Sequence, residues 1–238
     1  MQTLIRPLVA ADVVIGSTTQ QHPLGTLGET PDGRRFRYCE AGGTALVAGT
    51  LQQQVAIVAN HQNIAVAAAA AIGAETVTVT LGATLASVNQ YAEGFMVVND
   101  QAGEGFTYKI KGHPAAASAG SLTLTLDDSI RVALTTSSEV CLIANPYKDI
   151  VQHPTTPTGV AVGVPLFAMA IDNFGWIQTH GVVSCLSDAA PGSVGAALSP
   201  SNATAGALES GVIGQGVVGQ ALQTAVDTEY RAVFLTID

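Results

Sequence analysis

The chain has 238 residues and a formal net charge of −9 at pH 7, and only 11% of its residues are charged. Soluble domains average roughly 25% charged residues, so this composition suits a protein that packs against neighbouring subunits. The acidic balance argues against a general nucleic-acid-binding protein, because such proteins carry clustered lysine and arginine.

Neither a membrane span nor a disulfide framework is expected. The Ala-rich run Ile64–Ile72 is far shorter than the ~20 apolar residues that a membrane-spanning helix needs. The three cysteines, Cys39, Cys141 and Cys185, are widely spaced and form no C-x-x-C pattern. We therefore expect free thiols and synthesis in a reducing compartment.

Residues 1–35 show no sustained periodicity. Their second half, STTQQHPLGTLGETPDGRR, is rich in Gly, Pro, Thr and Gln. Such a composition is typical of irregular structure. We predict an extended N-terminal arm over residues 1–35, which is either disordered or laid along a partner.

From residue 36 the pattern changes to short strands separated by turn signals. Residues 36–73 are assigned to a β body. Next come two near-copies of one strand, Glu75–Leu81 and Ser121–Leu126, in which threonine alternates with branched aliphatic residues. This alternation gives a strand one apolar and one hydroxyl face. With a hairpin that turns at Asn99–Gly105 between them, they predict a compact β module over residues 74–150.

Residues 151–159 are rich in Pro and Thr and are predicted to be a linker. The β body then resumes over residues 160–238, with the apolar runs LFAMAI, FGWIQTHGVVSCL and YRAVFLTID. No long amphipathic helical pattern occurs anywhere in the chain. The sequence therefore predicts an all-β fold.

No catalytic constellation stands out. Gly214, Gly216 and Gly219 match the G-x-G-x-x-G pattern, but too few residues follow for the βαβ unit that a dinucleotide site needs. The five histidines are scattered without metal-ligand spacing, and no G-x-S-x-G nucleophile motif accompanies them. We expect no enzyme activity, no cofactor and no metal.

Arg34, Arg35 and Arg37 form the one local run of charge that suggests a site. Arginine forks pair well with carboxylates, so the cluster could contact an acidic protein surface. A solvated turn after Pro31-Asp32-Gly33 explains the same residues without a partner.

The segment FGWIQTHG holds Trp176, the only tryptophan in the chain. In a strand, Phe174, Trp176, Gln178 and His180 would point to one face. That face could be a ligand platform or a subunit contact, in which a tryptophan often serves as an anchor. Alternatively, Trp176 fills the core of its own subunit.

Several segments together resemble head decoration (cement) proteins of tailed bacteriophages. They are GRRFRYCEAGGTALVAGTLQ, VVNDQAGEGFTYKIKGH, CLIANPY, FGWIQTHGVVSCL and EYRAVFLTID. The resemblance implies a body similar to a β-barrel or β-tulip, which sits as a homotrimer on the outer capsid surface. It also implies an N-terminal arm on the shell, the major capsid protein as partner, and a place in the virion after synthesis in the host cytoplasm.

The resemblance implies one β body over residues 36–73 and 160–238, with 74–150 as an inserted module. The smallest proteins of this kind lack such a module. The module could stiffen the particle or bind a glycan or cell surface. The alternative function is therefore a carbohydrate- or receptor-binding component of a phage tail or fibre.

Overall fold

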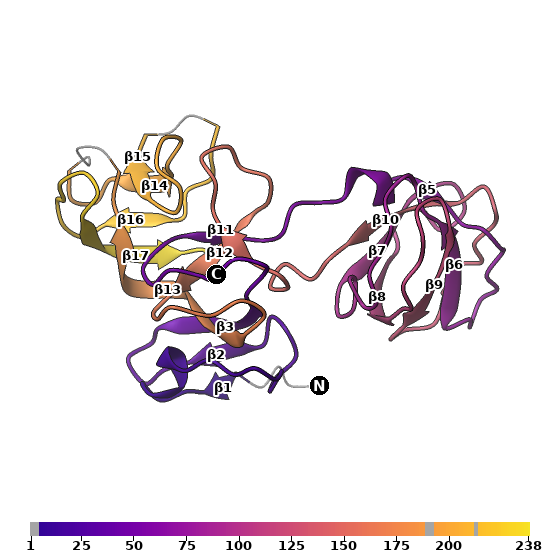
Figure 1. Cartoon of the computed structure of the whole chain (residues 1–238), viewed down its shortest axis with the longest axis horizontal. Helices are drawn as coiled ribbons and strands as arrows, with labels where there is room; N and C mark the ends of the chain where they lie inside the picture. The colour runs from indigo at the N-terminus through magenta and orange to yellow at the C-terminus, as the bar shows by residue number, and fades with distance from the viewer. Residues whose placement is uncertain (1–4, 189–192, 212–213) are drawn as a thin grey trace. The chain divides into compact units, whose positions relative to one another are not determined.

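The computed structural model describes residues 5–188, 193–211 and 214–238. Within these ranges the regular structure is almost entirely β, and the helical elements are two short 3-10 turns, η1 (Asp12–Val14) and η2 (Ala59–His61). The all-β prediction is confirmed. The chain divides into two compact units, Met1–Ala56 with Pro146–Asp238, and Ile57–Asn145 (Figure 1).

The first unit is built on an eleven-stranded sheet. Its main path runs β1-β2-β3-β13-β17-β16-β14-β15, while β4 pairs with β11 and β12, and β12 also pairs with β13. The strands are β1 (Arg6–Pro7), β2 (Leu27–Glu29), β3 (Arg35–Glu40), β4 (Gln52–Gln53), β11 (Val151–Gln152), β12 (Ala161–Pro165), β13 (Phe174–Leu186), β14 (Ala197–Pro200), β15 (Leu208–Ser210), β16 (Gly219–Ala221) and β17 (Tyr230–Thr236).

Strand β13 organises this unit because it changes partners along its length. Its first half pairs with β3 and its second half with β17, and His180 is opposite both Arg35 and Thr236. The next residue, Gly181, has a φ of +90°, which glycine adopts without the steric cost that a side chain would add. The pairing with the first half of β13 places β3 directly beside Trp176.

The core of the first unit consists of three clusters. The first lies around Trp176 and contains Leu8, Val13, Leu24, Phe36 and Tyr38. The second gathers Leu51, Val164, Val183, Cys185, Leu198, Leu208, Val218, Ala221, Val233 and Leu235. The third contains Cys39, Ala41, Leu46, Ile150, Val162, Met169 and Ile177. The first cluster is the one that joins residues near the N-terminus to β3 and β13.

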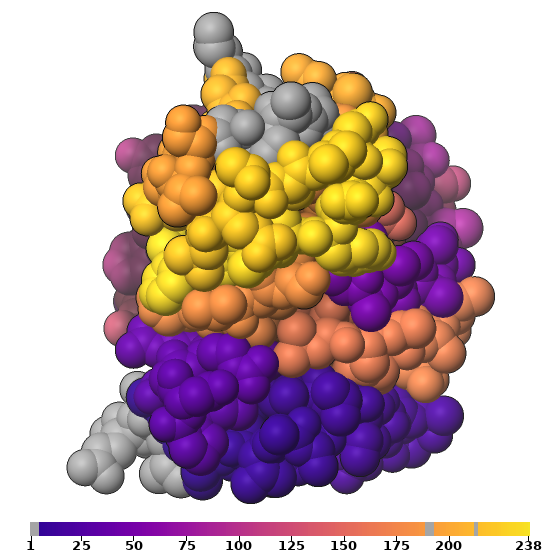
Figure 2. Space-filling view, turned by 90° about the vertical axis from the view of Figure 1, so that its left-hand side faces the viewer, coloured from indigo at the N-terminus to yellow at the C-terminus, as the bar shows by residue number. Residues whose placement is uncertain are grey.

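The prediction of an extended arm over residues 1–35 is wrong for residues 5–35, which fold onto the first unit; residues 1–4 lie outside the described part. Strand β1 pairs in parallel with β2, and β2 pairs with β3. The physical reason is burial: Leu8, Val13 and Leu24 are at most 9% exposed. In Figure 2 the indigo N-terminal residues form a continuous part of the surface of this unit.

The second unit is a nearly closed six-stranded barrel. Its sheet order is β5-β10-β7-β8-β9-β6, and a bridge between Val66 and Val79 links the two ends. The two near-copies of the sequence pattern become neighbours, with Thr78 opposite Thr123 and their hydroxyls 3.0 Å apart. The strands are β5 (Ile64–Ala65), β6 (Thr76–Thr80), β7 (Phe95–Asp100), β8 (Thr107–Gly112), β9 (Ser121–Leu126) and β10 (Glu139–Ile143).

The boundaries of the inserted module differ from the predicted 74–150. The second unit begins at Ile57, because Ile64, Val66 and Ala70 are buried in its core. It ends at Asn145, and Ile150 belongs to the core of the first unit.

The predicted linker over 151–159 is also partly structured, since β11 pairs with β4. The barrel-like sheet itself lies in the inserted unit, whereas the resemblance placed it in the body.

Candidate functional site around strands β3 and β13

Strands β3 and β13 bring the predicted site residues onto neighbouring strands. Trp176 is opposite Tyr38, and Ile177 is opposite Arg37. Because side chains alternate along a strand, Phe36 and Tyr38 point to the face that carries Trp176, while Arg37 points to the other face. Arg35 and Arg37 therefore cannot line one site with Trp176, whereas the Arg34 guanidinium lies 5.7 Å from the centre of the Phe36 ring.

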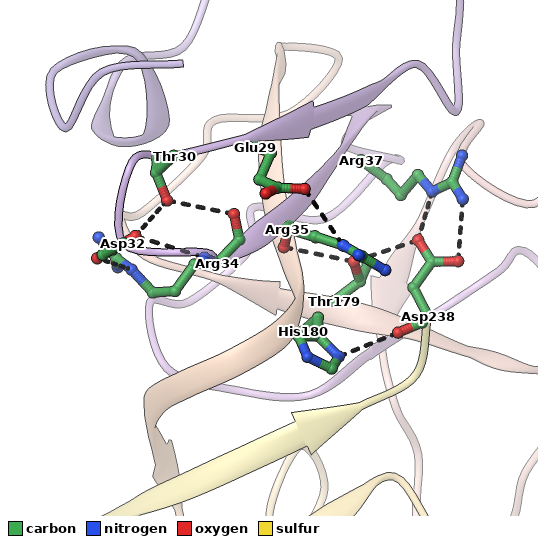
Figure 3. A network of polar contacts seen from close by, with 9 residues as sticks. All are labelled: Glu29, Thr30, Asp32, Arg34, Arg35, Arg37, Thr179, His180 and Asp238. Atoms are coloured by element: carbon green, nitrogen blue, oxygen red, sulfur yellow. Dashed lines mark hydrogen bonds and ion pairs between the residues drawn. The ribbon is translucent and has the colours of Figure 1, made fainter. Parts of the chain in front are cut away.

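Figure 3 shows Arg34 and Arg35 directed at carboxylates of the same chain. The Arg34 Nε lies 2.8 Å from Asp32 Oδ2, and the Arg35 Nε lies 3.4 Å from Glu29 Oε2. The Thr30 hydroxyl donates to Asp32 at 2.5 Å, and this hydrogen bond is the main reason that the pKa of Asp32 is lowered. Both ion pairs are partly exposed, so solvent screens them and they add little stability.

Arg37 makes the strongest of the three pairs. Its Nε and Nη2 donate to the two carboxylate oxygens of Asp238 at 2.5 and 2.9 Å, and its Nη1 donates to the carbonyl of Gly25 at 2.9 Å. The Thr179 hydroxyl donates to the same carboxylate at 3.3 Å. The hydrogen bond from Arg37 lowers the pKa of Asp238 and raises the pKa of Arg37.

These pairs decide between the two interpretations of the arginine cluster only in part. The cluster does follow a turn, as the solvated interpretation requires, but none of the three guanidinium groups is free. A partner carboxylate would have to compete with the carboxylates that already hold them. Arg35, whose side chain is 45% exposed, is the most accessible.

Trp176 lies in the interior of the first unit and is 4% exposed. Its ring meets Tyr38 edge-on at 5.2 Å, and the Tyr38 hydroxyl accepts a hydrogen bond from the backbone N–H of Gln21 at 3.0 Å. Burial raises the pKa of Tyr38. The tryptophan therefore packs in the core of its own chain, which is the second of the two interpretations of Trp176. Its cluster includes Leu8, Val13 and Leu24, so it holds the residues that precede β3 against the unit.

Sequence reasoning missed the residues that complete this cluster. Gly28 comes so close that a Cβ there would clash with Leu8 and reach within 3.0 Å of Trp176. The His22 ring lies 5.6 Å from Trp176, and the partly buried Phe174 ring stacks on Tyr38 at 6.3 Å. Leu8 and His22 come from the segment predicted to be an arm, and no periodic pattern marked them.

No group of three or more His, Cys, Asp or Glu side chains within the described ranges is arranged to hold a metal ion. Cys39 and Cys185 are buried free thiols, and burial raises the pKa of Cys185 to about 12. A thiol held in its protonated form is a poor nucleophile. In the same part of the chain, no helix has the length and apolar character to cross a membrane.

Comparisons of the chain with family models, with curated proteins and with solved structures found no match.

Proposed function

We propose that the protein is a structural component of a tailed-bacteriophage virion, which binds the major capsid protein on the outer surface of the head and stabilises the shell as a homotrimer. The proposal starts from the sequence resemblance to head decoration proteins. It is supported by an all-β chain of two units and by a composition with only 11% charged residues.

The observation that carries the proposal is the exposure of residues 5–15, here called the N-terminal strip. Ile5, Val9, Val14 and Ile15 are between 45% and 62% exposed, while Leu8 from the same strip is buried. A segment that places large aliphatic side chains both inward and outward is suited to being covered by a second protein. In this proposal that protein is the capsid.

The strip also offers a backbone edge. Strand β1 is the last strand on its side of the main sheet path, so its outer edge has no neighbour along that path. An edge strand can accept a strand of a partner through backbone hydrogen bonds. In this proposal the strip takes the role that the sequence-based hypothesis gave to an extended arm. The strip is folded onto the first unit, so it would contact the shell as part of that unit and not as a flexible chain.

A homotrimer would repeat the contact between the strip and the capsid three times, and this would strengthen the binding to the shell. Three copies around a symmetry axis present the same strip three times, and linked weak contacts add up through effective concentration.

A sedimentation assay tests the proposal. Purified protein is mixed with heads of the phage that encodes it, after removal of the native copies, and bound protein is measured in the pellet. We expect saturable binding that the double substitution Val9→Asp with Val14→Asp reduces at least about tenfold. The matched control is Val226→Asp, which alters a residue that is 64% exposed elsewhere on the first unit. Absence of binding by the unsubstituted protein would refute the proposal.

A further inference from the structure

We infer that a hollow beside Trp176 is a binding site for a single sugar ring that bears a carboxylate, such as a uronic acid. The hollow measures about 160 Å³ and lies within the first unit, between the N-terminal strip and the start of β13. Ligand pockets for drug-sized molecules are larger, about 300–1,000 Å³. The size therefore selects one ring and excludes a nucleotide. Because Arg6, Asp12 and Ile15 of the N-terminal strip line this hollow, the inference concerns the chain that is not bound to a capsid.

Aromatic rings form one wall of the hollow. His22, Tyr38, Phe174 and Trp176 all line it. The His22 ring meets Tyr38 at 5.0 Å and Trp176 at 5.6 Å, and Phe174 stacks on Tyr38. Rings fixed against one another in this way lose little freedom when a ligand binds, which favours affinity. His22 and Phe174 are the partly exposed rings that offer an apolar surface to the C–H face of a sugar, while Tyr38 and Trp176, which are 3% and 4% exposed, support them from behind.

Arg6 supplies the charge. Unlike the three arginines near β3, it makes no ion pair with any described residue, and it lines the hollow. A guanidinium fork matches the geometry of a carboxylate. A carboxylate on the ligand would give Arg6 the partner that the described residues do not provide.

His22 and Asp12 supply the hydrogen-bonding groups that hydroxyls need. The two imidazole nitrogens of His22 form no hydrogen bond within the described ranges, although an edge-on contact with Tyr38 and a tilted contact with Trp176 hold the ring in place. Burial and the nearby Arg6 lower the pKa of His22, so its neutral form offers one donor and one acceptor. Asp12 uses Oδ2 to accept the Val9 N–H at 2.9 Å, and a carboxylate has further acceptor capacity.

This polar side of the hollow distinguishes a sugar acid from a flat aromatic acid. An aromatic carboxylate could stack on the rings and pair with Arg6, but it has no hydroxyl to satisfy His22 and Asp12. Ser17 and Gln21 also line the hollow. Their side chains already hydrogen-bond Thr19, so His22 and Asp12 are the groups with capacity to spare for a ligand. A ring with several hydroxyls adds hydrogen bonds to them that a planar hydrocarbon ring cannot make, so the sugar acid should bind more tightly.

The single tryptophan makes the test direct. Because Trp176 lines the hollow, its fluorescence is followed while methyl glucuronide, methyl glucoside or benzoate is added to the full chain, and saturation-transfer NMR checks binding independently. We expect saturable binding of methyl glucuronide with a Kd of about 1 mM, and binding of the neutral glucoside that is at least about tenfold weaker. Arg6→Gln should remove this difference, while the control Arg35→Gln should preserve it.

Two results would overturn the inference. One is no binding of methyl glucuronide or galacturonate by either method at about 20 mM, well above the expected Kd. The other is benzoate binding as tightly as the uronic acids, which would show that the hydroxyl partners contribute nothing.

Discussion

Arg37 and Asp238 are 201 residues apart in the chain and form an ion pair with two hydrogen bonds, at 2.5 and 2.9 Å. The pair joins β3 to Asp238, which lies two residues after the end of β17, and Figure 3 shows it beside Thr179 and His180 of β13. Three strands that lie far apart in sequence thus meet at one carboxylate.

Replacing this carboxylate should weaken the first unit. Asp238→Asn leaves the size of the side chain unchanged but removes the charge that pairs with Arg37, and we expect a loss of about 1 kcal/mol in the free energy of unfolding. Denaturant unfolding at pH 7 measures it. The matched control is Glu29→Gln, whose pair with Arg35 is longer and more exposed and should cost less. An equal loss in both variants would contradict the special role of the Arg37 pair.

The same carboxylate predicts an acid effect. The pKa of Asp238 is lowered from 3.8 in the folded chain, mainly by the Arg37 hydrogen bond. Its stabilising contribution is therefore present above pH 3.8 and is lost as the pH falls through the folded pKa. The stability difference between wild type and Asp238→Asn should shrink below about pH 4. A difference that stays constant from pH 7 to pH 3 would rule out this linkage.

Two buried histidines predict a second pH dependence at higher pH. His113 and His153 each contact the carbonyl of the following proline through Nδ1 at 2.8 Å. Burial is the main cause that lowers the pKa of both from 6.5. The unfolded chain therefore takes up protons first, and the stability that holds above pH 6.5 falls as the pH drops below it towards the folded pKa.

The variants His113→Gln and His153→Gln test this separately in the two units. Each should reduce the fall in unfolding free energy between pH 7 and pH 5 for the unit that carries it. Hydrogen exchange at the two pH values resolves the units. An unchanged pH slope in either variant would show that the histidine is not the titrating group.

Trp176→Ala should destabilise the chain strongly because the ring is buried among side chains of its own unit. Large-to-small changes of a core tryptophan cost about 3–5 kcal/mol. Circular dichroism follows the unfolding, since the variant has no tryptophan. Trp176→Phe should cost much less. If Trp176→Ala kept wild-type stability and only loosened assembly, the ring would belong to an interface.

The second unit should fold when it is expressed alone as residues 57–145, because it has its own core and a nearly closed sheet. We expect a β-type circular dichroism spectrum and one cooperative unfolding transition. The control fragment is 74–150, which lacks β5 and the bridge between Val66 and Val79. Equal stability of the two fragments would mean that residues 57–73 do not contribute to the barrel.

Strands with a clear alternation of apolar and polar residues could be predicted from the sequence. The alternation in Ser121–Leu126 places every second side chain inside the barrel, and the predicted strand has the bounds of β9. Strand β5 has only two residues, Ile64 and Ala65, so alternation could not reveal it, and the start of the second unit was misplaced.

The candidate site was less accessible to sequence reasoning because its contacts join distant segments. Nothing in the local sequence of Arg37 points to Asp238, and nothing around Leu8 indicates that it packs near Trp176. The alternation along the start of β13 was predicted, and it places Phe174 and Trp176 on one face. Which face is buried depends on residues 5–35, whose irregular apolar spacing gives no periodic signal.

Cryo-electron microscopy of the tailed-phage head that is proposed to carry this chain would test the proposed function most directly. We expect density on the outside of the shell, in groups of three, into which the first unit fits with residues 5–15 against the capsid. Density for the protein on the tail or fibres, with none on the head, would contradict the proposal.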